Sequence, residues 1–126
     1  GFGFCFVSHI GEVGGCGYLP LLAGIVRERS LVEIYRTSPL FQSIRDPDLL
    51  QGRCGLCEYR VVCGGCRARA LSATGNYLEE EPFCTYQPTP ASCRRCPEGA
   101  GGTAGAFLRP ARAPRGLRMR PADHAV

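Results

Sequence analysis

The chain has 126 residues, a hydrophobic share of 44% and a formal net charge of +4, which is enough for one small domain. It contains no apolar run of transmembrane length and no signal-peptide pattern. Seven Arg and two acidic residues fall in 89–126, against eight Arg and nine acidic residues in 1–88. Since residues 1–88 carry no basic excess, we expect no nucleic-acid partner. Since no apolar run is long enough for a span, we expect no membrane partner.

The first predicted elements are short strands. Phe2, Phe4 and Phe6 alternate with smaller residues, and a period of two is typical of a strand. With the turn that follows, residues 2–16 predict a β-hairpin. The apolar stretch 19–26 predicts a buried loop or a short strand. Because the chain lacks an initiator Met and opens inside a predicted strand, we expect it to be a fragment of a longer protein.

Two short helices are predicted next. Ser30 and Glu33 form a capping-box pattern, which indicates a helix over about residues 31–36. Ser38 followed by Pro39 starts a second helix, because Ser is a preferred N-cap and Pro fits the first helical position. We expect this second helix to end at Asp46, which precedes another Pro.

The residues after 66 fall into three segments of different composition. Strong helix formers predict a helix over residues 67–73, with Gly75 as its stop. The acidic segment 77–83 is predicted to be a loop, and Glu79, Glu80 and Glu81 are expected to be solvated. About half of residues 89–126 are Ala, Gly or Pro, so we expect a disordered tail.

Nine cysteines are many for this length, and four of them form two CxxC pairs in the run Cys54-x2-Cys57-x5-Cys63-x2-Cys66. Cys84 follows eighteen residues later. Such pairs suit one metal centre better than disulfides between distant strands, so a reducing, cytoplasmic setting is expected. Neighbouring glycines allow tight turns and expose backbone N–H groups that hydrogen-bond cluster sulfurs. The run therefore predicts a metal site.

The spacing leaves two metals open. A structural zinc site would need only the four cysteines of the run and would leave Cys84 spare. Zinc ribbons, however, usually separate their CxxC pairs by far more than five residues. An iron–sulfur cluster is the other interpretation. The zinc interpretation would make the chain a zinc-stabilised binding module without a redox role.

A wider pattern resembles a known family. Gly11-x4-Cys16, the segment Ser30-Leu-Val-Glu-Ile-Tyr and the stretch Cys54-Gly-Leu-Cys-Glu-Tyr-Arg-Val-Val-Cys-Gly-Gly-Cys-Arg-Ala-Arg-Ala70 resemble the SPASM/twitch auxiliary domain of radical SAM enzymes. The chain is particularly similar to members associated with haem-type tetrapyrrole synthesis. The resemblance implies a small α+β domain over residues 1–88, with a β-hairpin and short helices around one or two [4Fe-4S] clusters. Residues 89–126 lie outside the resemblance.

The resemblance also implies a ligand grouping. Four cysteines match the ligands of the family's distal cluster: Cys54, Cys57, Cys63 and Cys84. Cys66 and Cys16 match two ligands of the proximal cluster, whose other ligands would lie upstream of Gly1. The sequence departs from the family at two points. The last gap of the run is two residues instead of three, and Cys5 is too close to Gly11 to be the family's first cysteine.

The radical SAM motif Cys-x3-Cys-x2-Cys is absent from these residues. The resemblance therefore implies that S-adenosylmethionine binds in an upstream barrel, which is the expected partner, and that this chain alone is inactive. The implied role is electron transfer or substrate positioning during radical modification of a peptide or a tetrapyrrole.

Smaller candidates have simpler interpretations. Arg67 and Arg69 could stabilise cluster charge or bind an anionic substrate, or they could form an exposed helix face. Cys93 and Cys96 form an isolated CxxC in the predicted tail, where chance is the better explanation. Cys5 is expected to be a small buried apolar residue.

Overall fold

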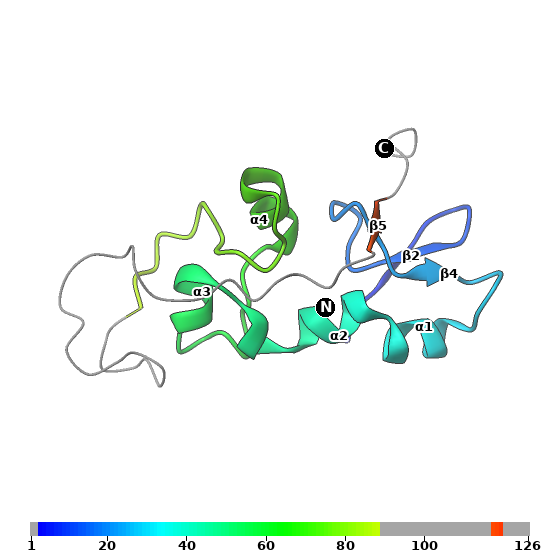
Figure 1. Ribbon diagram of the computed structural model, residues 1–126, viewed down its shortest axis with the longest axis horizontal. Helices are drawn as coiled ribbons and strands as arrows, with labels where there is room; N and C mark the ends of the chain where they lie inside the picture. Colours follow the sequence, from blue (N-terminus) through cyan, green and yellow to red (C-terminus); the bar gives the residue numbers. More distant parts are fainter. Residues whose placement is uncertain (1–2, 89–116, 120–126) are drawn as a thin grey trace. The chain divides into compact units, whose positions relative to one another are not determined.

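The computed structural model describes residues 3–88 and 117–119, which fall into two compact units. The first unit holds the residues up to Asp46 together with 117–119, and the second begins at Pro47 (Figure 1). Each has fully buried side chains, such as Phe41 in the first and Leu78 in the second. The described part is small α+β, as predicted. None of its helices is long and apolar enough to cross a membrane.

Three short antiparallel strands form the main sheet of the first unit. β1 (Phe6–Val7) pairs with β2 (Glu12–Gly14), and β2 pairs with β4 (Gly24–Ile25), which lies beside it in Figure 1. The β1–β2 pair confirms the hairpin predicted within residues 2–16. The first strand begins only at Phe6, later than the alternation of Phe residues indicates, and residues 1–2 lie outside the described part.

A second, two-stranded sheet joins distant parts of the sequence. β3 (Leu21–Leu22) pairs antiparallel with β5 (Arg118–Met119), with Leu21 opposite Met119. β3 and β4 confirm short strands in the stretch 19–26. Residues 117–119 depart from the predicted disorder, because β3 offers backbone hydrogen-bonding partners that composition does not reveal. The remainder of 89–126, with Cys93 and Cys96, lies outside the described residues.

Helix α1 (Leu31–Thr37) begins as its capping residue predicts. The Glu33 backbone N–H donates to Ser30 Oγ at 3.2 Å, which satisfies one of the helix's free N–H groups. The Glu33 carboxylate does not return to the cap; it accepts from Arg29 Nε at 3.0 Å. Only half of the predicted capping box therefore forms.

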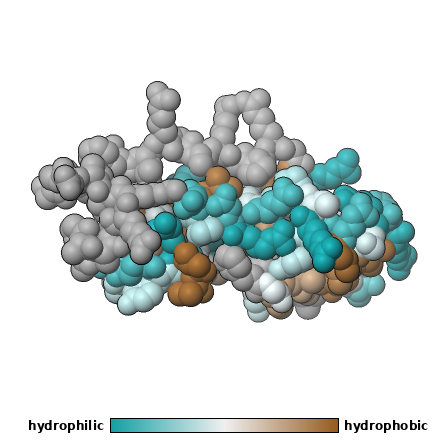
Figure 2. Space-filling view, turned by 90° about the horizontal axis from the view of Figure 1, so that it is seen from below, coloured by the Kyte–Doolittle hydropathy of each residue, from teal (hydrophilic) through white to brown (hydrophobic). Residues whose placement is uncertain are grey.

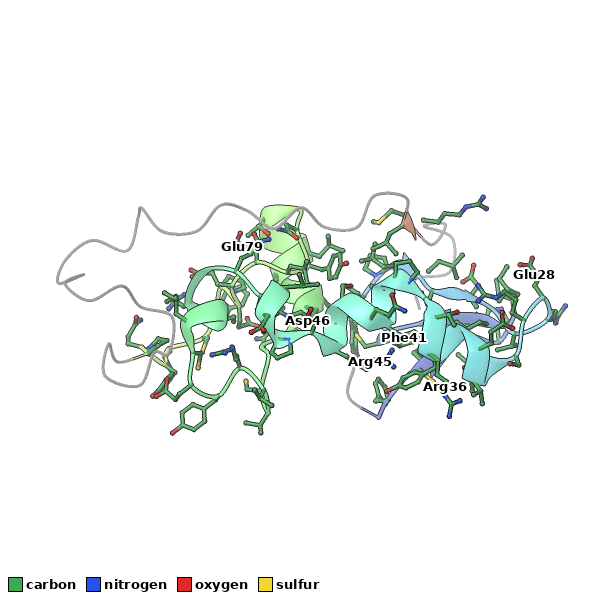
Figure 3. The ribbon with its side chains drawn as sticks, turned by 60° about the horizontal axis from the view of Figure 1, so that its bottom comes forward. Glu28, Arg36, Phe41, Arg45, Asp46 and Glu79 are labelled. Carbon is green, nitrogen blue, oxygen red and sulfur yellow. The ribbon has the colours of Figure 1, made fainter. Side chains whose placement is uncertain are left out.

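Helix α2 (Pro39–Arg45) follows directly. Ser38 occupies its N-cap position, as predicted, but makes no side-chain capping bond, and its buried Oγ has no partner in the described residues. Pro39 at the first helical position has no N–H to satisfy. In Figure 3, Phe41 and Arg45 are labelled on α2 and Arg36 on α1. The Arg45 guanidinium lies 4.6 Å from the Tyr35 ring centroid, and Nη2 donates to the Arg36 carbonyl at 3.5 Å.

These two serines allow a matched prediction. Ser30→Ala should lower the free energy of unfolding by about 1 kcal/mol, because the capping bond is lost. Ser38→Ala should be neutral or slightly stabilising, because a buried hydroxyl without a partner contributes only its desolvation cost. Urea unfolding of the full chain, followed by circular dichroism, measures both changes. Equal losses in the two variants would contradict the assigned caps.

The core of the first unit forms where α1 and α2 cover the sheet. Val13, Ile34 and Phe41 are fully buried together, and Cys5 packs against them. Cys5, expected to be buried, packs against this core but is only partly buried. Gly24 is needed here because a Cβ would come within 3.0 Å of the Ile34 side chain.

The second unit contains a 3₁₀ turn at Pro47–Leu49 and helices α3 (Gly52–Leu56) and α4 (Arg67–Thr74). α4 confirms the predicted helix over 67–73, and its C-cap Gly75 has φ +76°, as a glycine stop requires. α3 was not predicted, because its two glycines are poor helix formers.

Candidate metal centre

Four of the predicted ligand cysteines line one pocket of the second unit: Cys54, Cys57, Cys63 and Cys84. The same pocket is bordered by Arg53, Arg60, Gly64, Gly65, Glu81, Tyr86 and Pro88. Cys66 is not among the lining residues, and Cys16 belongs to the first unit. All seven cysteines of the described residues are free thiols. The structure thus brings together the set that includes Cys84 and leaves Cys66 outside it.

The backbone between the CxxC pairs explains the short spacing. Cys54 lies within α3, and Cys57 caps its C-terminus. Tight turns follow, in which the Arg60 N–H donates to the Cys57 carbonyl at 3.1 Å and the Cys63 N–H to the Tyr59 carbonyl at 2.8 Å. Five residues are therefore enough to return the chain to the pocket.

Two consecutive glycines carry the chain from Cys63 to α4. Gly64 and Gly65 have φ of +65° and +66°, a backbone conformation that other residues rarely adopt. A Cβ at Gly65 would lie only 2.6 Å from Arg67 Nη2 and 3.0 Å from Cys54 Sγ. The glycine therefore supplies both the turn and the space beside the Cys54 sulfur.

The Cys54 sulfur receives two hydrogen bonds. The Glu81 backbone N–H donates to Sγ at 3.3 Å, and Arg67 Nη2 donates at 3.5 Å. N–H donors directed at a ligand sulfur are a common feature of cysteine-bound metal groups. The hydrogen-bond donors around Cys54 therefore fit a metal-ligand sulfur.

Cys66 has a separate environment at the N-cap of α4. Burial alone would raise the pKa of its thiol, but hydrogen bonds from the Arg69 backbone, the Arg69 side chain and the Ala68 backbone outweigh it and lower the pKa. The Cys66 thiol therefore ionises more easily than an ordinary cysteine, and it does not line the four-cysteine pocket.

Glu81 connects these two environments, contrary to the predicted solvated loop. Its side chain is buried at 5% exposure. One carboxylate oxygen accepts from the Cys66 N–H at 2.9 Å, and the other pairs with Arg69 Nε at 3.2 Å. The prediction failed because three consecutive acidic residues suggest solvent exposure, whereas α4 and the Cys66 backbone supply donors for one of them.

The pocket rim also holds groups that the sequence did not single out. Tyr86 lines the pocket, and its hydroxyl donates to the Glu58 carboxylate, which raises the pKa of Tyr86 to about 12. The Tyr59 ring packs edge-on against Tyr86 at 5.4 Å between centroids. Burial raises the pKa of the Cys57 thiol on the same side. An aromatic rim of this kind has no spacing signal in the sequence.

Large apolar side chains of the cysteine segment are exposed to solvent. Val62, between the two pairs, is 82% exposed, and Tyr59, Val61 and Phe83 are also exposed. Figure 2 shows hydrophobic areas in brown among hydrophilic ones on one face of the molecule. A contiguous patch of such groups marks a contact surface, whereas single exposed apolar residues are common.

Glu80 supports the wall of the pocket through Arg53. Its carboxylate accepts from the Arg53 N–H at 2.8 Å and pairs with Arg53 Nε at 3.2 Å. Burial opposes ionisation, but these bonds outweigh it and lower the pKa of Glu80. The Arg53 guanidinium also donates to the Cys84 carbonyl at 3.1 Å. Glu80 therefore holds Arg53, which precedes Cys54 in the chain and bonds to Cys84.

This pair predicts a pH dependence. Because the folded-state pKa of Glu80 is depressed, its contribution to stability is present above the unfolded pKa of about 4.3 and is lost as pH falls through the folded value. Urea midpoints at pH 6 and pH 3 should therefore differ more for the parent chain than for Glu80→Gln. An identical pH dependence in both proteins would contradict the assigned pair.

The separation of the thiols bears on which metal group the pocket could hold. Among residues 3–88 and 117–119, no three His, Cys, Asp or Glu side chains are placed to hold a single metal ion. The four thiols nevertheless surround a common pocket. A cluster distributes its ligands over several iron atoms and accommodates wider separation than a tetrahedral zinc site.

No family model matches the chain. It is 59% identical over 88 residues to an AdoMet-dependent heme synthase of Methanosarcina barkeri. The aligned segment covers 70% of this chain and 25% of the relative. A protein of the same name from Oleidesulfovibrio alaskensis is 52% identical over 97 residues, with 75% and 25% covered. A PqqA peptide cyclase of Granulibacter bethesdensis is 33% identical over 90 residues, with 68% and 24% covered.

The chain is homologous to radical SAM enzymes. This confirms the resemblance read from the sequence, and the heme synthases named here share more identity with the chain than the PqqA peptide cyclase does. The chain spans about a quarter of the length of the curated relatives it matches. At family level, radical SAM enzymes use S-adenosylmethionine and iron–sulfur clusters.

Proposed function

We propose that this chain is the C-terminal auxiliary domain of a radical SAM enzyme and binds at least one [4Fe-4S] cluster. The four-cysteine pocket carries the proposal, because it contains the cysteines that the family pattern assigns to one cluster. The auxiliary domain supports electron transfer or positions the substrate. The setting is a reducing compartment such as the cytoplasm, in which thiolate ligands persist.

The residues of the pocket have distinct roles in this proposal. Cys54, Cys57, Cys63 and Cys84 hold the cluster, which supplies one-electron transfer when bound. The left-handed turns at Gly64 and Gly65 return the chain past the pocket without side chains that would fill it. The partly buried Arg53 and Arg60 place positive charge at the pocket wall, opposing the negative charge of four thiolates.

Cys66 and Cys16 are proposed ligands of a second cluster. Cys66 is outside the four-cysteine pocket, and hydrogen bonds from α4 and Arg69 lower the pKa of its thiol. The remaining ligands would come from residues upstream of Gly1. The four-cysteine cluster does not depend on this second assignment.

The upstream barrel is the proposed partner, and it would bind S-adenosylmethionine. The relatives are about four times longer than their aligned segment, so a parent of similar length has room for it. The exposed Tyr59, Val61 and Val62 give this unit an apolar surface for such a contact. The names of the relatives favour a tetrapyrrole or a peptide as the substrate.

Anaerobic reconstitution tests the cluster. The full chain, incubated with iron and sulfide and desalted, should retain both with the broad absorption of an iron–sulfur protein. Stoichiometric uptake of zinc with no labile sulfide would favour the zinc-stabilised module and refute the proposal. The coding sequence upstream of Gly1 tests the parent enzyme separately: a Cys-x3-Cys-x2-Cys motif is expected there.

A further inference from the structure

The strongest observation outside the ligand set concerns Arg67, the first residue of α4. Arg67 and Arg69 are two residues apart, yet they differ in surroundings. Arg69 is exposed and pairs with Glu81, whereas Arg67 is partly buried and extends toward the cysteine pocket. Only Arg69 therefore fits the exposed helix face that the sequence allows.

The Arg67 guanidinium is held in place by backbone carbonyls. Nη1 donates to the Tyr77 carbonyl at 2.9 Å and to the Glu79 carbonyl at 2.7 Å. This leaves Nη2 directed at Cys54 Sγ, 3.5 Å away. Two fixed bonds on one nitrogen orient the planar group, so the contact with sulfur costs little additional ordering.

The surrounding residues leave space for the contact between Arg67 and Cys54. Gly65 has no side chain, and a Cβ there would clash with both Arg67 Nη2 and Cys54 Sγ. The Glu81 N–H approaches the same sulfur at 3.3 Å. Arg67 Nε is buried and has no partner in the described residues, so it remains available to an acceptor that they do not supply.

We propose that Arg67 is a positioning residue that raises the reduction potential of the cluster held by Cys54. This inference rests on the proposed function. A reduced cluster carries one more negative charge than an oxidised one, so a fixed cation and N–H donors at a ligand sulfur stabilise the reduced form more. Arg67 also fixes the direction of the Cys54 sulfur.

The test is a redox titration of the anaerobically reconstituted full chain with dithionite, followed by electron paramagnetic resonance. Arg67→Met should lower the ratio of reduced to oxidised cluster about tenfold at a fixed potential, equivalent to about 59 mV for one electron. Arg67→Lys should restore part of the shift, because it keeps the charge but not the planar geometry. Arg69→Met, which removes one charge from the same helix, should shift the ratio much less.

The outcomes separate the two proposals. If the parent chain takes up no iron and sulfide, the proposed function fails. If the parent and Arg67→Met load equally and titrate at one potential, only the role of Arg67 fails. If Arg67→Met takes up little iron and sulfide, Arg67→Gln replaces it in the titration, because the Gln amide can still donate to the carbonyls. An unchanged reduction potential in Arg67→Gln overturns the inference.

Discussion

Replacing Cys84 by alanine should reduce bound iron and labile sulfide to background, whereas Cys66→Ala should retain a cluster. Cys84 lines the pocket with three other cysteines, and Cys66 does not. A four-cysteine zinc site built from the CxxC pairs predicts the opposite ranking, because it needs Cys66 and leaves Cys84 spare. The measurement is the iron and sulfide content of each full-length variant after anaerobic reconstitution.

Cys5→Ala is the matched control for this experiment. Cys5 packs beside the core of the first unit and is not a proposed ligand. Its substitution should leave iron and sulfide unchanged. Retention of iron in Cys84→Ala, together with its loss in Cys66→Ala, would contradict the ligand grouping proposed for the pocket.

Gly55→Ala should be among the most destabilising single changes in the second unit. Gly55 is buried in α3 between Cys54 and Cys57, and an added Cβ would lie 2.2 Å from the Leu50 carbonyl oxygen. Backbone atoms cannot yield as a flexible side chain does, so α3 must shift. We expect a loss of about 3 kcal/mol in unfolding free energy, together with weaker cluster uptake because both flanking cysteines move.

Gly75→Ala provides the comparison for Gly55. Gly75 has φ +76°, and nothing lies within 4 Å of an added Cβ. The change should therefore cost only the left-handed backbone strain, about 1 kcal/mol, and leave cluster uptake unchanged. Urea unfolding and iron content distinguish the two variants. Equal effects on both measurements would show that the Leu50 contact does not restrict Gly55.

The predictable parts of the fold are those with local signals. The capping pattern at Ser30 and the glycine stop at Gly75 act through neighbouring residues, so the sequence locates α1 and α4 closely. The pairing of β3 with β5 joins segments almost a hundred residues apart, and no local pattern indicates it. Helix α3 was missed because its glycines oppose helix propensity, while the chain around Cys54 requires their small size.

The candidate site also has a part that the sequence predicts and a part that only the packing determines. The cysteine spacing predicts a metal site and, through the family resemblance, the grouping of Cys84 with Cys54. The burial of Glu81 and the contact between Arg67 and Cys54 depend on how α4 packs, which a run of acidic or basic residues does not reveal. Side-chain position within a charged segment is thus the information that the sequence lacks.

The central claim is that the pocket formed by Cys54, Cys57, Cys63 and Cys84 binds a [4Fe-4S] cluster. Mössbauer spectroscopy of the full chain, reconstituted anaerobically with ⁵⁷Fe and sulfide, tests it most directly because it identifies the iron species. We predict the quadrupole doublet of a diamagnetic [4Fe-4S]²⁺ cluster, and its disappearance in Cys84→Ala. A spectrum of mononuclear iron bound by four thiolates, or the same cluster signal in Cys84→Ala, would contradict the account.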